Sequence, residues 1–286
     1  MNIGFTERNF TLFRKAMQLN TKIKITLILI FVSITIILIF LPSIKLYYNQ
    51  AMNREFIVNV ESNALSANIK IVQLKYETGV NSRAIAVSAG ASGVLIRKED
   101  NRYFVLTAKH VITELDDVDK TQIVVMGYDD LDYKDYLNMG GEYVGIANYY
   151  LQFPEITVEY MNDKSDLALI SFTSDKVYTV LSLAENVAEY GDKVVSMSNP
   201  CGKRNIVTAG KIRSKGFWNY EDEAGNFKYS IIKHSAATSE GSSGSALLNE
   251  ELEIVGITLG GNENIFRQFV SGMAIPKDQI LAFLRE

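Results

Sequence analysis

Residues 240–248 read EGSSGSALL, a turn rich in glycine and serine that leads into an apolar strand. Two earlier segments also place a polar residue beside an apolar strand. Residues 103–112, YFVLTAKHVI, have His110 just past the end of an apolar run. Residues 165–170, SDLALI, have Asp166 directly before one. Together the three segments predict a β-rich fold with reactive side chains at strand edges.

The three polar residues, His110, Asp166 and Ser243, have the types needed for nucleophilic catalysis by a serine. A hydroxyl is a poor nucleophile at neutral pH and needs an adjacent base. His110 would accept the proton of Ser243, and Asp166 would fix the tautomer of the imidazole and stabilise the imidazolium. The segment from His110 to Asp166 and the segment from Asp166 to Ser243 are each long enough for the chain to cross a β-barrel and return to the same edge.

Neighbouring residues compete for two of these roles. Ser242 and Ser245 are alternative hydroxyls, but only Ser243 has a glycine two positions before it and another one position after it. Asp163 is an alternative carboxylate, but no strand follows it directly, unlike Asp166. We therefore predict Ser243 as the nucleophile and Asp166 as the acid.

Two further residues are interpreted as non-catalytic. His234 is expected to be structural or to lie at the rim of a pocket. Cys201 is the single cysteine, and no second histidine is placed to serve it as an acid or base.

The glycines beside Ser243 also have a predicted purpose. A tight turn at Gly241 would aim the backbone N–H groups of Gly241 and Ser243 at a developing oxyanion. Such donors stabilise the transition state by roughly 3–4 kcal/mol each. Gly244 would let the chain pass close behind the nucleophile.

Short apolar runs bounded by Gly, Asn and Asp continue along the chain from about residue 68. Many short strands at such spacing predict a sandwich or barrel. Residues 114–142, rich in Asp, Glu and Tyr, are expected to form a surface hairpin or insertion. Residues 276–285 predict a closing helix, with Pro276 in its first turn. The apolar runs are 69–74, 94–96, 103–106, 123–126, 167–172, 194–197, 206–209, 254–257 and 273–275.

Residues 25–44 are uncharged and mostly apolar. As a helix they would span roughly 30 Å, the thickness of a hydrocarbon core. A buried soluble helix and a cleaved signal peptide are the alternatives, but the run is long for a signal peptide and no small-residue cleavage site follows closely. We therefore expect an uncleaved anchor.

Positive charge predicts the orientation of this anchor. Five Lys or Arg residues precede residue 25, whereas only Lys45 and then Arg54 follow the span. Positive charge is retained in the cytoplasm, so the N-terminus should be cytoplasmic and the rest exported to the periplasm or the cell exterior. The expected organisation is a cytoplasmic segment 1–24, a transmembrane anchor 25–44, a helical connector or stalk 45–67 and a folded domain 68–286.

Composition excludes several other classes. The formal net charge of −4 gives no basis for a nucleic-acid partner. One cysteine excludes an intrachain disulfide, and two histidines without a metal-binding motif give little support for a metal. No phosphate-binding loop is present, and we expect no cofactor.

The chain resembles the HtrA/Deg-like branch of the trypsin-fold serine proteases and the glutamyl endopeptidases. The likeness covers about residues 68–286, and we expect no PDZ domain after it. Residues 199–202, NPCG, resemble the family turn GNPxG, with Ser198 at its first position. The other matching motifs are SGVLI at 92–96, TAKHV at 107–111, DLA at 166–168, GSSGS at 241–245, GITLGG at 256–261 and MAIP at 273–276.

The resemblance implies an all-β fold of two six-stranded Greek-key barrels with a C-terminal helix. The barrels would cover about 68–175 and 176–275, with the helix at 276–285. It also implies a serine endopeptidase that cleaves proteins or peptides through an acyl-enzyme. Residues 245–246, Ser-Ala, depart from the usual Gly-Pro of the family.

By the same resemblance, Ala237 forms the base of the substrate pocket, and Thr258 and Gly260 form its wall. None is charged, so we expect a small or medium uncharged side chain before the scissile bond. Thr258 stands where the glutamyl endopeptidases have a pocket histidine, so glutamate specificity is not carried over.

Two non-catalytic alternatives remain. One is an inactive or weakly active protease-fold module that binds peptides or misfolded proteins, and the other is a membrane-tethered sensor. The presence of all three triad residue types argues against the inactive module. The oligomeric state does not follow from the sequence.

Overall fold

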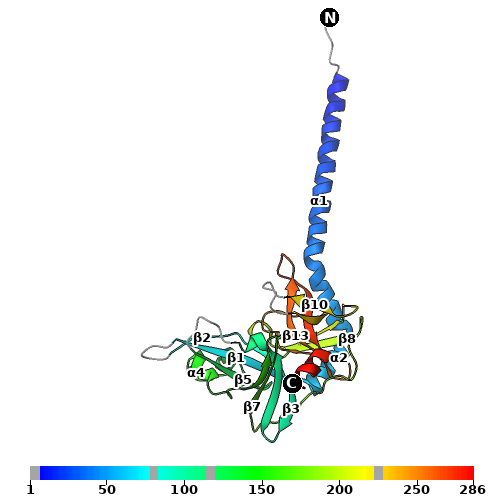
Figure 1. The fold of residues 1–286 in the computed structure, drawn as a ribbon. Coiled ribbons are helices and arrows are strands. Elements are labelled where there is room, and N and C mark those ends of the chain that lie inside the picture. The colour runs from blue at the N-terminus through cyan, green and yellow to red at the C-terminus, as the bar shows by residue number, and fades with distance from the viewer. Residues whose placement is uncertain (1–6, 78–82, 114–119, 222–227) are drawn as a thin grey trace. The chain divides into compact units, whose positions relative to one another are not determined.

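The computed structural model describes residues 7–77, 83–113, 120–221 and 228–286 (Figure 1). The chain divides into two compact units, Met1–Tyr47 and Tyr48–Glu286. Helix α1 (Glu7–Met52) contains the expected anchor, and its segment Thr21–Leu41 has a mean hydropathy of 2.8. This segment is long and apolar enough to span a membrane, and none of it is buried in the protein.

The first sheet of the larger unit has seven antiparallel strands. It closes into a barrel where β5 meets the segment before β6, because the Val125 N–H donates to Pro154 O (3.0 Å) and the Ile156 N–H donates to Ile123 O (3.0 Å). Its path is β2 (Arg83–Val87), β1 (Asn68–Glu77), β3 (Ala91–Glu99), β4 (Arg102–Ala108), β7 (Leu167–Thr173) and β6 (Thr157–Asn162), and β5 (Lys120–Met126) pairs with β1.

The second sheet also has seven strands. It closes where the residues after β9 meet β11: Ile212 bridges His234, and the Arg213 N–H donates to Lys233 O (2.7 Å). The all-β, two-barrel expectation is confirmed, with seven described strands in each sheet where six were expected. Its path is β10 (Trp218–Glu221), β11 (Lys228–His234), β14 (Phe269–Pro276), β13 (Ile254–Glu263), β12 (Ala246–Leu248), β8 (Lys193–Ser198) and β9 (Ile206–Lys211).

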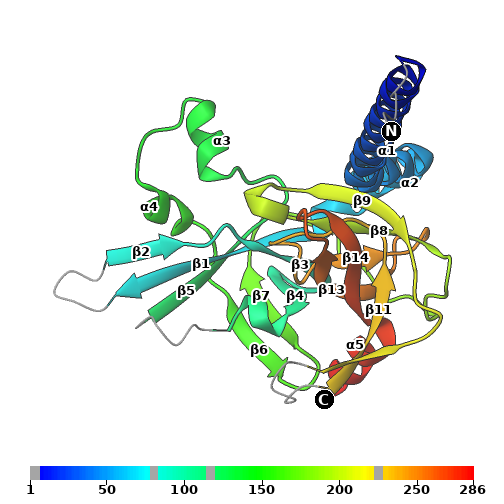
Figure 2. The same cartoon turned by 90° about the horizontal axis from the view of Figure 1, so that it is seen from above.

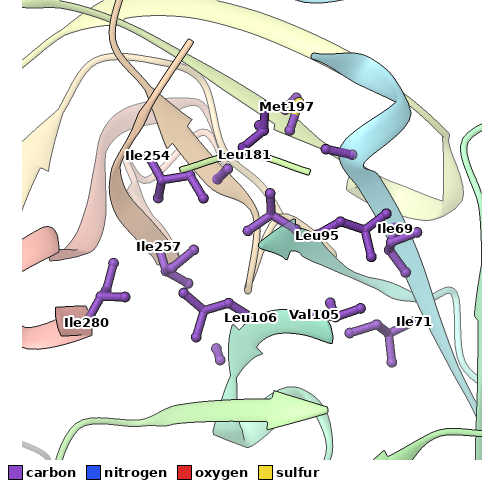
Figure 3. Packing of buried hydrophobic residues seen from close by; sticks show 14 of the residues in the cluster. Ile69, Ile71, Leu95, Val105, Leu106, Leu181, Met197, Ile254, Ile257 and Ile280 are labelled. Carbon is purple, nitrogen blue, oxygen red and sulfur yellow. The ribbon is translucent and has the colours of Figure 1, made fainter. Parts of the chain in front are cut away.

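A single hydrophobic cluster joins the two sheets (Figure 3). Leu95 and Leu106 enter it from the first sheet, and Ile254 and Ile257 enter it from the second. All four are fully buried. Truncation of such a leucine to alanine typically costs about 2–5 kcal/mol, so this cluster fixes the strand edges that carry the site.

Most of the expected connector belongs to the folded unit. Helix α2 (Arg54–Asn63) buries Phe56 and Val60 in the main cluster, and the 3-10 turn η1 (Leu65–Ala67) leads directly into β1. The Gln50 side chain is bound to both backbone groups of Ala209 on β9. These residues therefore pack on the second sheet and do not form a free stalk.

The acidic, tyrosine-rich insertion expected over 114–142 contains β5 and one short helix, and a second short helix follows it. Helices α3 (Tyr133–Asn138) and α4 (Ile146–Tyr150) lie beside the β1–β2 hairpin (Figure 2). Their tyrosines pack with Val72 and Leu74 of β1. A surface insertion was expected here, but the described part is helical after β5 and is not a simple hairpin. Residues 114–119 of the expected region lie outside the described residues.

The chain ends in helix α5 (Lys277–Phe283). Pro276 is its N-cap, and Ile280 and Phe283 are buried in the main cluster. The expected closing helix is therefore present over slightly fewer residues than predicted.

Candidate active site

Two paired strands place His110 beside Asp166. His110 lies in the turn η2 (Lys109–Val111) directly after β4, and Asp166 directly precedes β7. Because Ala108 pairs with Leu167, the two polar residues leave the sheet at the same edge. His110 Nδ1 lies 2.7 Å from Asp166 Oδ2, and the His110 backbone N–H donates to Asp166 Oδ1 at 2.9 Å.

Asp166 has a left-handed backbone, with φ of 51°. This conformation is uncommon outside glycine, although Asp tolerates it better than most residues. It allows the Asp166 carbonyl to accept from the Lys109 N–H (2.8 Å) while its carboxylate reaches His110. The competing Asp163 is exposed and pairs with the Lys109 ammonium. The geometry therefore favours Asp166 as the partner of the imidazole.

Ser243 lies in the turn before β12, and backbone hydrogen bonds tie this turn to both barrels. The Ser92 N–H of β3 donates to Ser243 O (3.0 Å), and the Gly244 N–H donates to Thr258 O of β13 (2.7 Å). Gly244 has φ of 82°, and a Cβ there would lie 2.1 Å from Ser92 O and 3.1 Å from Ala108 N. The serine turn is thus pressed against the end of β4, two residues before His110.

The Ser243 hydroxyl donates to the Leu259 carbonyl at 2.7 Å. Proton transfer to His110 would require the hydroxyl to leave this carbonyl. Catalytic hydrogen bonds are often absent or long in free enzymes and form in the substrate complex.

The two neighbouring serines are fully buried, whereas Ser243 is partly exposed. Ser242 Oγ accepts from the Ser239 N–H (3.1 Å), and Ser245 Oγ lies 3.2 Å from Ser196 Oγ. Both hydroxyls are therefore occupied inside the second barrel, so Ser243 is the hydroxyl of this turn that is open to a ligand.

The same turn presents two backbone donors. The Cys201 N–H donates to Glu240 O at 2.7 Å. A trans peptide directs its N–H away from its carbonyl, so the Gly241 N–H points away from Cys201. Within the described residues, neither the Gly241 N–H nor the Ser243 N–H has an acceptor, although the N–H groups of 242, 244 and 245 do. Two unpaired N–H groups on one turn can donate hydrogen bonds to an oxyanion.

Ser92 connects this turn with the loop at 199–205. Its hydroxyl donates to Gly241 O (2.8 Å) and accepts from the Asn199 N–H (2.9 Å). Gly241 has φ of 86°, and a Cβ there would lie 2.6 Å from Asn199 O. Glycine at 241 is therefore required both by the backbone and by the close approach of this loop.

The insertion also forms hydrogen bonds to the loop at 199–205. Asn205 Nδ2 donates to Tyr128 O (2.6 Å), and the Arg204 guanidinium donates to Gly127 O. The loop also contains Cys201, which has φ of 51° and orients the Glu240 carbonyl. These contacts were not anticipated from the sequence, because they join segments 77 residues apart in the chain.

The expected pocket residues lie around this turn. Ala237 is half-buried and its carbonyl accepts from Thr208 Oγ1 (2.9 Å). Thr258 is fully buried on β13, and the space beside the Gly260 Cα is open. His234 is fully buried at the end of β11, so it does not lie at an exposed rim. Its burial was missed because the sequence around it gives no clear strand pattern.

The described residues contain no cluster of three or more His, Cys, Asp or Glu side chains that could hold a metal. Cys201 is a free, exposed thiol whose Sγ lies 3.5 Å from Ser239 Oγ.

Two closed antiparallel barrels, with a His–Asp pair on one and a Gly-x-Ser-Gly turn on the other, define the class of trypsin-fold proteins. The chain belongs to the trypsin-like peptidase domain family, whose model matches residues 91–257. This match contains all three predicted triad residues.

Relatives and a solved structure agree with this assignment. The chain is 34% identical over 129 residues to the periplasmic serine endoprotease DegP of Salmonella typhimurium, covering 41% of this chain and 24% of DegP. It is 28% identical over 189 residues to the serine endoprotease DegS of Haemophilus influenzae, covering 65% of this chain and 46% of DegS. The chain thus spans less than half the length of these relatives.

The protease domain of MamO from Magnetospirillum magneticum has a similar fold. The TM-score is 0.53 at 17% identity, over 78% of this chain and 97% of that domain. At this identity the likeness shows the fold alone.

Proposed function

We propose that this chain is a membrane-anchored serine endopeptidase that hydrolyses peptide bonds with the triad His110, Asp166 and Ser243. The proposal rests mainly on the two hydrogen bonds between Asp166 and His110, at 2.7 Å to the ring Nδ1 and 2.9 Å from the backbone N–H. The neighbouring turn carries a partly exposed serine and two N–H groups without an acceptor in the described residues. Membership of a family whose relatives are serine endoproteases supports the same chemistry.

The reaction would follow from these groups. Ser243 Oγ attacks the scissile carbonyl carbon as His110 takes its proton, and Asp166 stabilises the imidazolium. The N–H groups of Gly241 and Ser243 bind the oxyanion of the tetrahedral intermediate. His110 then protonates the leaving amine, which leaves an acyl-enzyme on Ser243. Water, deprotonated by His110, attacks the ester and releases the acid.

The anchor and its orientation are part of the proposal. The apolar helix segment supports a single span, and the excess of Lys and Arg before it supports a cytoplasmic N-terminus. The protease domain would then lie outside the cytoplasm and act on substrates near the membrane, where tethering raises their effective concentration.

A tag placed after Glu286 tests this orientation. In spheroplasts of a bacterial expression host, external protease should degrade the tag and leave a cytoplasmic marker intact. A tag protected together with the marker would contradict the orientation. Release of a soluble protein starting near residues 45–67 would identify a cleaved signal peptide.

One observation favours a second function, a peptide-binding module without turnover. The Ser243 hydroxyl donates to the Leu259 carbonyl and is not bound to His110. If that arrangement persisted with a peptide bound, the nucleophile would not be activated.

Hydrolysis of an unfolded protein separates the two functions. The full chain in detergent should cleave casein, and Ser243→Ala should abolish cleavage without changing thermal unfolding. His110→Ala should cost a similar factor, because triad members act as a unit. Peptide binding without any cleavage by the unaltered chain would establish the second function.

A further inference from the structure

Three buried polar side chains lie close to the proposed nucleophile without hydrogen-bond partners. They are His234 at both ring nitrogens, Thr238 at its hydroxyl and Thr258 at its hydroxyl, within the residues that the structure describes. His234 and Thr258 are 0% exposed and Thr238 is 4% exposed. Buried polar groups are nearly always paired, so unpaired ones in one place call for a ligand or another explanation.

Strand register places His234 and Thr258 on one face of the second sheet. Ile232 and Thr258 both pair with Ala274 of β14, so these three residues share a face. His234, two residues after Ile232, lies on the same face and pairs with Gly272. The imidazole and the Thr258 hydroxyl therefore project to the same side of the sheet, with β14 between their strands.

Two glycines make room for these groups. A Cβ on Gly272 would lie 2.1 Å from His234 Cε1 and 2.4 Å from its Nε2, so the imidazole lies flat across this glycine. A Cβ on Gly261 would lie 2.3 Å from Thr238 Oγ1. Gly261 and Gly272 are paired in the sheet, so the Thr238 hydroxyl also belongs to this group.

Backbone contacts connect the group to the nucleophile. The Thr258 N–H donates to Ser245 O (2.9 Å), and Thr258 O accepts from the Gly244 N–H (2.7 Å). The next residue, Leu259, accepts from the Ser243 hydroxyl. Thr238 lies five residues before Ser243 on the same loop. Thr258 and Thr238 are therefore connected to the serine turn through the backbone, and His234 lies on the same face of the sheet across β14.

We infer that His234, Thr238 and Thr258 form the inner end of the primary specificity subsite, and that this subsite takes a carboxamide side chain, Gln or Asn. The inference rests on the proposed function, because it assigns the residue before the scissile bond. The sequence predicts an uncharged side chain in the pocket of Ala237, Thr258 and Gly260. The three unpaired groups indicate that this side chain is also polar.

The chemistry of the three groups selects the carboxamide. A neutral imidazole and two hydroxyls offer both donors and acceptors, and a carboxamide also carries both. An aliphatic side chain would leave all three groups unpaired. A carboxylate accepts only and would be buried without a cation, which is costly.

The state of the imidazole agrees with this selection. Burial lowers the pKa of His234 to about 4, so the ring is uncharged at neutral pH. The Ala236 backbone opposes this shift in part, although it does not meet hydrogen-bond geometry with either ring nitrogen. No charged group in the described part of the chain contributes to this pKa.

Matched peptides that differ only in the residue before the scissile bond test the inference. We expect the full chain in detergent to cleave the Gln or Asn peptide with a kcat/KM at least tenfold above the Leu and Glu peptides. His234→Phe keeps the ring shape without nitrogens and should lower the Gln/Leu ratio at least tenfold. Thr238→Val should lower the same Gln/Leu ratio. This variant tests the inference if His234→Phe does not fold. Thr173→Val, at an exposed position of the other barrel, should leave it unchanged.

A preference for Leu or Glu, or a Gln/Leu ratio unchanged in both His234→Phe and Thr238→Val, would overturn the inference. Labelling of the unaltered chain by a fluorophosphonate separates this failure from that of the proposed function. A labelled Ser243 with a Leu preference would refute only the carboxamide subsite. No labelling and no cleavage of any peptide would refute the proposed function and the inference with it.

Discussion

Asp166 holds His110 at two points, through the backbone N–H at 2.9 Å and through Nδ1 at 2.7 Å. The backbone bond sets the position of the carboxylate, and the ring bond sets the orientation of the imidazole. With its Nδ1 bound, the imidazole has Nε2 left for a serine hydroxyl. This relationship depends on the pairing of β4 with β7 and on the left-handed backbone at Asp166.

Replacement of Asp166 by Asn tests this relationship. The amide cannot hold the imidazole in the required tautomer or stabilise the imidazolium, so kcat/KM should fall by about 10⁴. Thermal unfolding should change little, because the side chain keeps its size. A loss of less than tenfold would show that Asp166 does not act in catalysis.

Ser92→Ala should weaken the proposed oxyanion hole. The change removes the hydroxyl between Gly241 O and the Asn199 N–H and leaves both unpaired, a cost of about 1–3 kcal/mol. We expect kcat to fall at least tenfold while KM changes little, because the N–H groups act mainly on the transition state.

Ser88→Ala is the matched control for Ser92. Ser88 Oγ also accepts a backbone N–H, that of Gln73 at 2.9 Å, but within the described residues it makes no hydrogen bond to the serine turn. It should cost some stability and leave kcat unchanged. Equal losses of kcat in the two variants would show that Ser92 acts only through general stability.

The buried pair of Lys70 and Asp132 should anchor the insertion. The Lys70 ammonium is bound to the Asp132 carboxylate, and burial lowers the pKa of Lys70 although Asp132 favours its charged form. Lys70→Met leaves a buried carboxylate without its cation and should lower the free energy of unfolding by about 3–5 kcal/mol.

The double variant Lys70→Met, Asp132→Asn should recover part of this loss. Urea unfolding, followed by fluorescence of the single tryptophan, measures both variants. A double variant that is less stable than Lys70→Met alone would contradict a paired interaction.

His234 should make the fold sensitive to acid. The pKa is about 4 in the folded chain against an ordinary value of 6.5, so the unfolded chain binds more protons between these pH values. The free energy of unfolding should therefore fall as pH drops from 6.5 to 4, by about 3 kcal/mol from this residue.

His234→Phe should remove this part of the pH dependence. The difference in unfolding free energy between the unaltered chain and the variant isolates His234, because all other titrating groups are shared. A difference that stays constant from pH 7 to pH 4 would show that the imidazole is not held neutral in the fold.

Part of this architecture could be predicted from local patterns. Every apolar run singled out in the sequence lies within a strand, because a strand buried on one or both faces needs such a run. Strand β6 was missed because most of its residues are exposed and it lies at the edge of the sheet. Helix α2 was expected in a connector because its buried pair, Phe56 and Val60, is too sparse to indicate a packed helix.

In the candidate site, too, some features could be predicted from local sequence and others depend on the fold. The turn residues Gly241 and Ser243 could be located because the glycine pattern is local. The partner of the Ser243 hydroxyl could not, because Leu259 reaches it only through the fold of β13. The burial of His234 likewise depends on Gly272, which lies 38 residues further along the chain.

The identity of the reactive hydroxyl tests the central claim most directly. The full chain in detergent is treated with a fluorophosphonate, and the modified peptide is sequenced by tandem mass spectrometry. We predict one adduct on Ser243, lost in Ser243→Ala and in His110→Ala. An adduct on Ser242 or Ser245, or no adduct on a chain that remains folded, would contradict the assignment of Ser243 as the nucleophile.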